Sequence, residues 1–202
     1  MVISKLKNFI FILAGLIMLM FFSTGFNYSR EFEKKVLVIY PQVSEKTRPE
    51  LIDYYINYME NTLVKLDYKP VTRHFLDLYY ESNNKKPGDE LNFDSIKQIA
   101  IDSNCDLIIY TIIDEYRANR SLKPGLAILE PVTLNTTIAG TVKIDSIFID
   151  VENFSNENRI SVEKYSKNRV LGMVTLKKYL LQKTLRECIG ETLYLAQKKE
   201  LL

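Results

Sequence analysis

Residues 105–113 read CDLIIYTII, and this stretch decides the fold class. Its apolar residues run without the alternation of a half-exposed strand, which is typical of a strand buried on both faces of a sheet. A second run, KVLVIY at residues 35–40, is stopped by Pro41 and predicts another central strand. A strand that is covered on both faces needs helices on each side, so the two runs indicate an α/β layer fold.

Three helices are expected around these strands. Residues 47–66 begin with a capping-box pattern and carry apolar side chains every three or four residues. Asp94 is expected to cap a shorter helix that ends near Asn104. A long helix is predicted from about residue 174 to residue 199. Its apolar stripe comprises Leu181, Leu185, Ile189, Leu193 and Ala196.

The remaining segments predict three further strands. Residues 68–75 predict a strand, and residues 76–81 are compatible with a short helix. Residues 136–151 predict a long strand whose apolar parity switches, which indicates either a bulge near residues 145–146 or burial on both faces. A return strand begins at residues 160–162. The expected order is β-α-β-α-β-β-β-α, giving one mixed α/β (α+β) sheet with helices packed on it.

The first 25 residues have the layout of a secretory signal peptide. Two lysines precede a continuous apolar run, and residues 23–25 supply small side chains for cleavage. The alternative is an uncleaved anchor, because no charge occurs from residue 8 to residue 29 and a membrane span needs about 20 residues. Under either interpretation the bulk of the chain is exported to the periplasm, the cell envelope or the cell exterior. Residues 26–34 are then a flexible lead-in, and residues 35–200 form a single α/β domain.

The charge balance excludes a strongly basic nucleic-acid protein, because 27 Lys and Arg stand against 25 Asp and Glu, for a net charge of +2. Two cysteines and one histidine are too few for a zinc finger or a disulfide-framed miniprotein. In an oxidising compartment Cys105 and Cys188 would be able to form one disulfide. The alternative is two buried free thiols, since cysteine packs well as a small apolar side chain.

Few residues indicate catalysis. The turn after the first strand, residues 41–44, has no glycine, so no Rossmann cofactor site is expected. His74 is the single imidazole, while Asp114 and Glu115 end the buried strand, where α/β folds often place their sites. A ligand-binding or enzymatic site made of these three side chains is the second hypothesis for function. No catalytic residue, cofactor or metal ligand is assigned.

Aromatic side chains favour an interaction surface. The chain has 13 tyrosines, three of them crowded on the first predicted helix, and tyrosine combines a large apolar area with a polar tip. Residues 117–135 are expected to form an irregular stretch or a loose hairpin, and long loops are often functional. The candidate contact residues are Tyr54, Tyr55, Tyr58, Arg117, Arg120 and Lys123.

Three motifs occur in a fixed order before the terminal helix: residues 35–41 (KVLVIYP), residues 104–109 (NCDLII) and residues 147–152 (IFIDVE). In this order they resemble the strands of the amino-terminal domain of TolB and of the related domain in curli-secretion-type envelope proteins. The Thr-Gly turn usual after the third motif is replaced here by residues 153–156. The resemblance implies an α/β fold and a non-catalytic module that contacts other envelope proteins.

The expected function is therefore that of an exported, non-catalytic envelope protein that acts as a protein–protein interaction or assembly module. Its partners are expected to be other envelope proteins and not nucleic acid, and its membrane contact is expected only through residues 1–25. A third hypothesis is a homo-oligomer built on the C-terminal helix.

Overall fold

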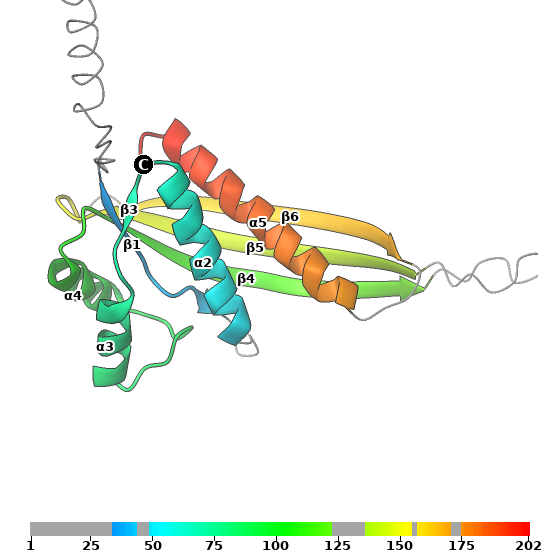
Figure 1. Ribbon diagram of the computed structural model, residues 1–202, viewed down its shortest axis with the longest axis horizontal. Coiled ribbons are helices and arrows are strands. Elements are labelled where there is room, and N and C mark those ends of the chain that lie inside the picture. Colours follow the sequence, from blue (N-terminus) through cyan, green and yellow to red (C-terminus); the bar gives the residue numbers. More distant parts are fainter. Residues whose placement is uncertain (1–33, 44–48, 123–135, 155–156, 171–174) are drawn as a thin grey trace, which may run out of the picture. The chain divides into compact units, whose positions relative to one another are not determined.

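The computed structural model describes five stretches of the chain: residues 34–43, 49–122, 136–154, 157–170 and 175–202 (Figure 1). They belong to one compact unit, Phe32–Leu202. The described residues form a mixed sheet of six strands with four helices packed against it, so the predicted α/β class is confirmed. None of the helices in these stretches is long and apolar enough to cross a membrane.

The first half of the sheet is parallel. β1 (Lys35–Val38) lies between β3 (Lys69–Pro70) and the start of β4 (Leu107–Leu122), and it pairs in parallel with both. The short strand β2 (Gln42–Val43) also pairs in parallel with β4. The two apolar runs that predict central strands are thus neighbours in the sheet, where each supplies the other's backbone partners.

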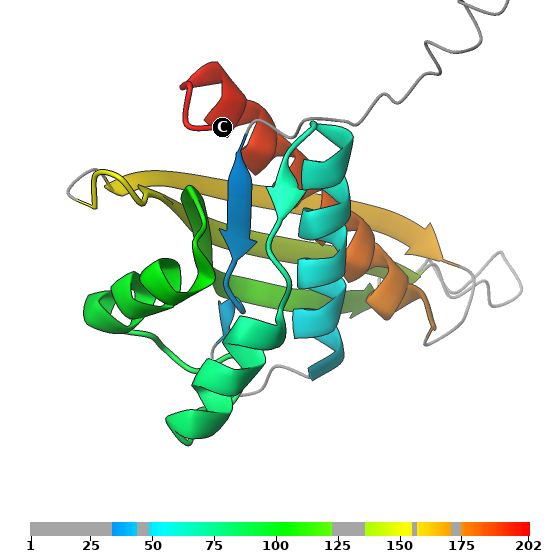
Figure 2. The same ribbon diagram turned by 60° about the vertical axis from the view of Figure 1, so that its left-hand side comes forward.

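Helices connect these strands, because parallel neighbours need a crossover. α2 (Pro49–Lys65) leads from the β1 side to β3, while α3 (His74–Ser82) and α4 (Phe93–Ser103) lead on to β4. The predicted helix over residues 47–66 is confirmed from Pro49 onward. α2 and α5 (Thr175–Lys198) lie side by side on one face of the sheet (Figures 1 and 2).

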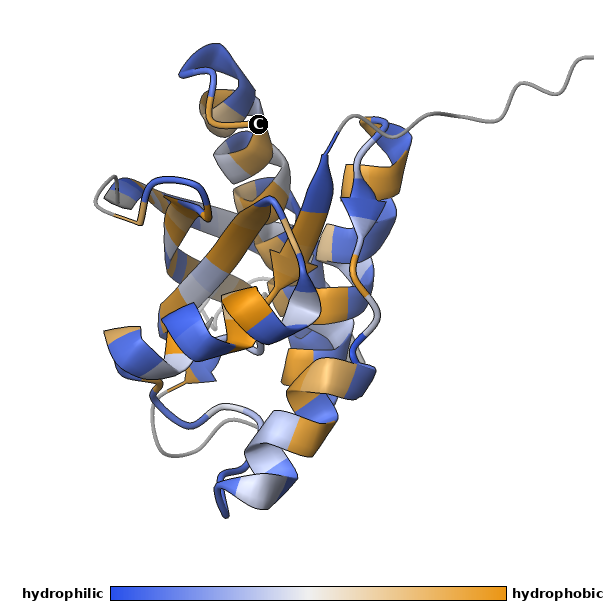
Figure 3. Cartoon of the chain, turned by 90° about the vertical axis from the view of Figure 1, so that its left-hand side faces the viewer, coloured by the Kyte–Doolittle hydropathy of each residue, from blue (hydrophilic) through white to orange (hydrophobic). Residues whose placement is uncertain are grey.

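Both faces of the parallel half are covered. Thr111 of β4 accepts a hydrogen bond from Tyr55 of α2, whereas its neighbour Tyr110 accepts one from the backbone N–H of Leu91, just before α4. Because successive strand residues point to opposite faces, α2 and the segment leading into α4 cover opposite sides of β4. The central strands are accordingly the most uniformly hydrophobic part of the fold, while the helices alternate between hydrophobic and hydrophilic residues (Figure 3).

The second half of the sheet is an antiparallel ribbon. β4 runs on to pair with β5 (Thr136–Asp150), which pairs with β6 (Glu157–Val170), giving the order β3-β1-β4-β5-β6. α5 covers one face of this ribbon. All five residues of its predicted apolar stripe are buried, and the stripe is confirmed: Leu181, Leu185, Ile189, Leu193 and Ala196. The opposite face presents exposed side chains such as Arg117 and Tyr165.

The irregularity in this ribbon lies in β4. The register steps by one residue between Ile113 and Glu115, which leaves Asp114 as a bulge. The pairing of β5 with β6 has no such step. The bulge predicted near residues 145–146 is therefore wrong. The alternative of burial on both faces is confirmed at these two positions, which pair with Ile112 and Thr111 before the bulge at Asp114, since Asp145 is 5% exposed and Ser146 is 0% exposed.

The segment after β3 folds differently from the prediction. β3 spans only two residues, and His74 and Phe75 begin α3 instead of ending a strand. Leu76 and Tyr80 are the buried residues of this helix, and their spacing of four places them on one helical face. Pro70 has no N–H to continue the ladder, which favours an early end to the strand.

Two further boundaries differ in detail. Asn92 caps α4, with its side-chain oxygen accepting a hydrogen bond from the N–H of Ser95 at 2.8 Å, so the expected cap at Asp94 is wrong. Asn104 ends the helix in the left-handed conformation with φ of 50°, as predicted. Residues 117–122 continue β4, so this part of the expected irregular stretch is strand. Residues 123–135 lie outside the described residues.

Candidate interaction surface

The tyrosines of α2 separate into two groups by the direction that they face. Tyr54 and Tyr58 are four residues apart and half-buried on the side toward α5. The Tyr54 hydroxyl donates to the carbonyl oxygen of Gln182 in α5 at 3.4 Å. Two of the three predicted contact tyrosines therefore reach the surface where two helices meet.

α5 contributes further aromatic and basic side chains at this junction. Tyr179 is 57% exposed, and Lys178 forms an ion pair with Glu50 of α2 at 2.7 Å. Burial raises the pKa of Tyr54, the neighbouring Tyr58 and Tyr179 raise it further, and the Arg186 guanidinium opposes them. Tyr58, Tyr179 and Arg186 thus lie close enough to the Tyr54 hydroxyl to influence its charge. We call Tyr54, Tyr58, Tyr179 and Arg186 the tyrosine–arginine surface.

Tyr55 is not part of this surface. Its side chain is 0% exposed, and its hydroxyl donates to the Thr111 oxygen at 2.5 Å. Thr111 and Ser146 share a further hydrogen bond of 2.8 Å, so a chain of three hydroxyls joins α2 to β4 and β5 inside the core. The expectation that Tyr55 contacts a partner is therefore corrected: position 55 points into the sheet, one residue round the helix from Tyr54.

The predicted basic contact residues follow β4 toward the far end of the ribbon. Arg117 is exposed and forms an ion pair with Glu115 two residues earlier on the same face. Arg120 lies in β4 opposite Ile138 of β5. Lys123 lies outside the described residues. The part of this group that the structure describes belongs to a regular strand and not to a loop.

The second hypothesis placed Asp114, Glu115 and His74 in one site. Asp114 forms an ion pair with Lys143 of β5 at 3.1 Å, and this contact raises the pKa of Lys143. Glu115 is engaged by Arg117, and His74 is the first residue of α3. The structure thus gives each acid its own cationic partner on the ribbon and places the imidazole on another element.

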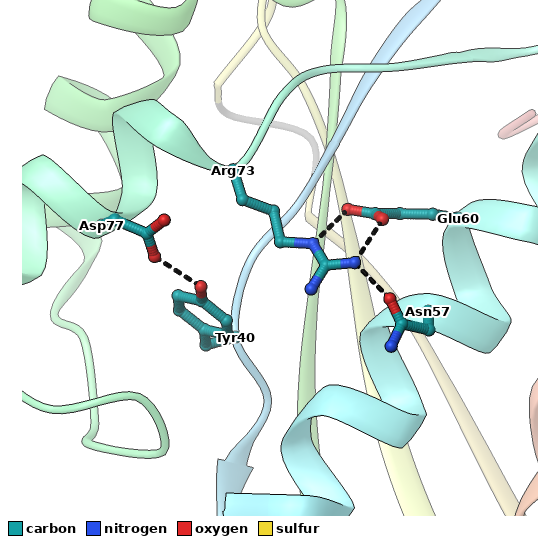
Figure 4. A network of polar contacts seen from close by, with 5 residues as sticks. All are labelled: Tyr40, Asn57, Glu60, Arg73 and Asp77. Atoms are coloured by element: carbon teal, nitrogen blue, oxygen red, sulfur yellow. Dashed lines mark hydrogen bonds and ion pairs between the residues drawn. The ribbon is translucent and has the colours of Figure 1, made fainter.

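A polar network at the carboxyl end of β1 was not predicted (Figure 4). Arg73 donates to both carboxylate oxygens of Glu60, at 3.2 and 2.9 Å, and also to Asn57. Tyr40 donates to Asp77 of α3 at 2.6 Å. Burial and the Asp77 contact raise the pKa of Tyr40. The network ties α2 and α3 to the end of β1, and its paired charges indicate a structural role.

The two cysteines are free and buried. The Cys188 thiol donates to the carbonyl oxygen of Val142 at 3.5 Å, and burial raises its pKa to about 12. Burial also raises the pKa of Cys105. Because the thiolate is the reactive form, both thiols are poor nucleophiles near neutral pH. Within the described stretches, no group of three His, Cys, Asp or Glu side chains has a metal-binding arrangement.

Comparison with known proteins gives structural neighbours only. No protein-family model matches the chain, and no curated protein matches its sequence. The lipoprotein GNA1162 from Neisseria meningitidis is 13% identical with a TM-score of 0.47, over 76% of this chain and 96% of that one. The PelC dodecamer from Paraburkholderia phytofirmans is 14% identical with a TM-score of 0.46, over 79% and 84%. The LpoB C-terminal domain from Salmonella enterica is 12% identical with a TM-score of 0.36, over 65% and 83%. At these scores the likeness carries no conclusion for this chain.

Proposed function

We propose that the chain is an exported, non-catalytic protein of the bacterial cell envelope that acts by binding other envelope proteins. The observation that carries the proposal is the tyrosine–arginine surface between α2 and α5. Export rests on the sequence of residues 1–25, and the envelope location rests on the resemblance of the strand motifs to the amino-terminal domain of TolB.

The composition of this surface is that of a binding site. Tyrosine and arginine are the residue types most enriched at the centres of protein interfaces, because both offer a large contact area and a hydrogen-bonding tip. The neighbouring ion pair of Lys178 with Glu50 is exposed on both sides, at 59% and 67%, which suits a solvated rim. An aromatic centre with a charged rim is the usual layout of a transient protein interface.

A non-catalytic role is supported by the state of the polar groups. Asp114 and Glu115 are engaged by cations, and the thiols of Cys105 and Cys188 are held protonated by burial. The polar networks of the core link secondary-structure elements to one another. These groups therefore hold the fold together, while the Tyr179 side chain at the α2–α5 junction is 57% exposed and available to a partner.

The test is site-specific photo-crosslinking in intact cells. A photoreactive phenylalanine analogue replaces Tyr179, which is 57% exposed, and, as a matched control, Ile101 of α4, which is 58% exposed. We expect a discrete adduct with another envelope protein at position 179, weakened at least tenfold by Arg186→Glu. The proposal fails if position 179 gives no adduct beyond that of position 101, or if Arg186→Glu leaves it unchanged.

A further inference from the structure

The sheet has two edges of very different character. β3, at one edge, has two residues, one of them Pro70, which cannot donate a ladder hydrogen bond. β6, at the other edge, has 14 residues and pairs with β5 alone among the described strands. A strand at an edge leaves every second N–H and C=O pointing outward, ready to pair with another strand.

β6 lacks two of the features that usually block such pairing, namely a bulge and an uncompensated inward-pointing charge. Its register with β5 continues without a step from Glu157 to Val170, so no bulge twists the edge away. An inward-pointing lysine commonly guards an edge strand. Here Lys164 points toward α5 and forms an ion pair with Glu191, so its charge is already compensated within the chain.

The two faces of β6 differ in polarity. Ile160 and Val162 are 3% and 5% exposed on the face under α5, whereas Arg159 and Glu163 are exposed on the open face. This alternation fixes which residues of an added strand must face which side, because a shift by one residue would reverse both faces.

We infer that β6 pairs antiparallel with β6 of a second copy of this chain, around a two-fold axis at Ser161. In this register Ile160 of one copy stands opposite Val162 of the other. Arg159, which forms an ion pair with Asp145 of its own chain but is 57% exposed, stands opposite Glu163. Each contact occurs twice because the axis relates the two strands. Apolar pairs lie on the face under α5 and opposite charges on the open face, which are the cross-strand pairs that stabilise a sheet.

Neighbouring registers fit less well. An axis at Glu163 places that carboxylate opposite itself and Arg159 opposite Lys167. An axis at Lys164 places the ammonium group opposite itself. Like charges directly opposite one another destabilise a sheet. An axis at Val162 places Ile160 opposite Lys164, and an axis at Tyr165 places Val162 opposite Asn168, so both set an apolar residue against a polar one.

This inference stands apart from the proposed function, because β6 and the tyrosine–arginine surface lie on different elements. The dimer would be built on the sheet edge and would leave Tyr54 and Tyr179 free for another protein. A failed crosslink at position 179 therefore leaves the dimer unaffected, and a failed dimer leaves the partner surface unaffected.

Disulfide crosslinking of the full chain in intact cells tests the register. Ser161→Cys places one thiol opposite its symmetry mate, within the Cα separation of about 4.5–5.5 Å for facing antiparallel residues, which a disulfide spans. Glu163→Cys places the two thiols four residues apart along the strands, about 13 Å, which a disulfide cannot span. Ser82→Cys, exposed on α3, measures random collision. The native cysteines are buried and add no background.

We expect a covalent dimer for Ser161→Cys at least ten times more abundant than for Glu163→Cys or Ser82→Cys. Adding Glu163→Lys should reduce that dimer at least tenfold, because Lys then faces Arg159, while Glu163→Gln should reduce it less. Lys143 of β5 stands opposite Glu163 in the same chain, so a thermal melt by circular dichroism checks that the lysine variant folds. Equal crosslinking at positions 161 and 163, or at 161 and 82, would overturn the inference, as would a folded lysine variant that dimerises normally.

Discussion

The two halves of the sheet differ in how many of their faces are covered, although β4 runs through both halves. Before the bulge at Asp114, β4 is buried at nearly every position, from Leu107 to Ile113, because helices cover both faces. After the bulge the same strand alternates between exposed Arg117 and half-buried Ala118, because α5 covers one face only. The parallel half therefore forms the densely buried core, whereas the ribbon leaves one face of its strands exposed to solvent.

The largest expected effect is a difference in unfolding free energy between one isoleucine-to-alanine substitution in each half of the sheet. Ile109 is 0% exposed in the two-sided core, and Ile109→Ala should lower the free energy of unfolding by about 4 kcal/mol. Ile138, near the far end of the ribbon, packs in a small cluster with Leu180 and Ala118, and Ile138→Ala should cost about 2 kcal/mol because that site relaxes more readily. Urea unfolding followed by circular dichroism measures both losses. Equal losses would show that the ribbon is packed as strictly as the parallel half.

Two glycines differ in the space that their surroundings leave for a side chain. Gly88, in the loop before α4, has φ of +102°, and a Cβ there would lie 2.8 Å from Val43 and 3.0 Å from Ile52. Gly88→Ala should therefore cost about 2 kcal/mol through backbone strain and contact. Gly190 of α5 has no atom within 4 Å of an added Cβ, so Gly190→Ala should stabilise the helix by up to about 1 kcal/mol. Gly88→Ala should lower the melting temperature and Gly190→Ala should raise it. A lower melting temperature for Gly190→Ala would contradict the open space around Gly190.

Two buried tyrosines allow the contribution of one hydroxyl hydrogen bond to stability to be measured. The Tyr55 hydroxyl bonds Thr111, whereas the Tyr80 hydroxyl has no hydrogen-bond partner among the described residues. Tyr55→Phe should cost about 1 kcal/mol, the usual net value of a buried hydrogen bond, and Tyr80→Phe should be neutral or slightly stabilising. The two substitutions remove the same atom from equally buried rings, so unequal unfolding free energies report the hydrogen bond. Equal costs would indicate a partner for Tyr80 as well.

The features that the sequence predicts are those that local periodicity encodes. The run at residues 105–113 and the stripe of α5 carry their burial in their spacing, and both are confirmed. The short helix that residues 76–81 allow is present as α3, but its start at His74 is not predicted, because only two of its residues, Leu76 and Tyr80, are buried and mark its face. The bulge at Asp114 was missed because it depends on the register against β5, which no single strand reveals.

The candidate surface was predicted in part for the same reason. Tyr54 and Tyr58 are visible on a helical wheel as neighbours, four residues apart. Tyr179 and Arg186 join them only because α5 packs beside α2, which brings together residues more than a hundred positions apart in the chain. The apolar spacing of α2 places Tyr55 on the same buried stripe as Ile52 and Met59, and the structure confirms this stripe. The prediction of Tyr55 as a contact residue is wrong because it rests on the crowding of three tyrosines and not on that spacing.

The smallest expected effect concerns a buried charge on the face of β5 that points away from α5. Asp145 is 5% exposed, and its burial alone would raise its pKa, but hydrogen bonds from Ser161 and Arg159 and the charge of Arg159 lower the pKa below its ordinary value. A lowered pKa in the folded chain means that the unfolded chain binds the proton more readily. The stability that Asp145 contributes is therefore complete above about pH 4 and is lost as pH falls through the lowered native pKa.

Arg159 is 57% exposed, which limits this contribution to about 1 kcal/mol. Asp145→Asn should flatten the acid side of the stability curve by that amount. Urea midpoints measured between pH 7 and pH 2 provide the comparison. Parallel curves for the wild type and Asp145→Asn would mean that the ion pair of Asp145 with Arg159 adds nothing to the free energy of unfolding, as is common for pairs with one exposed partner.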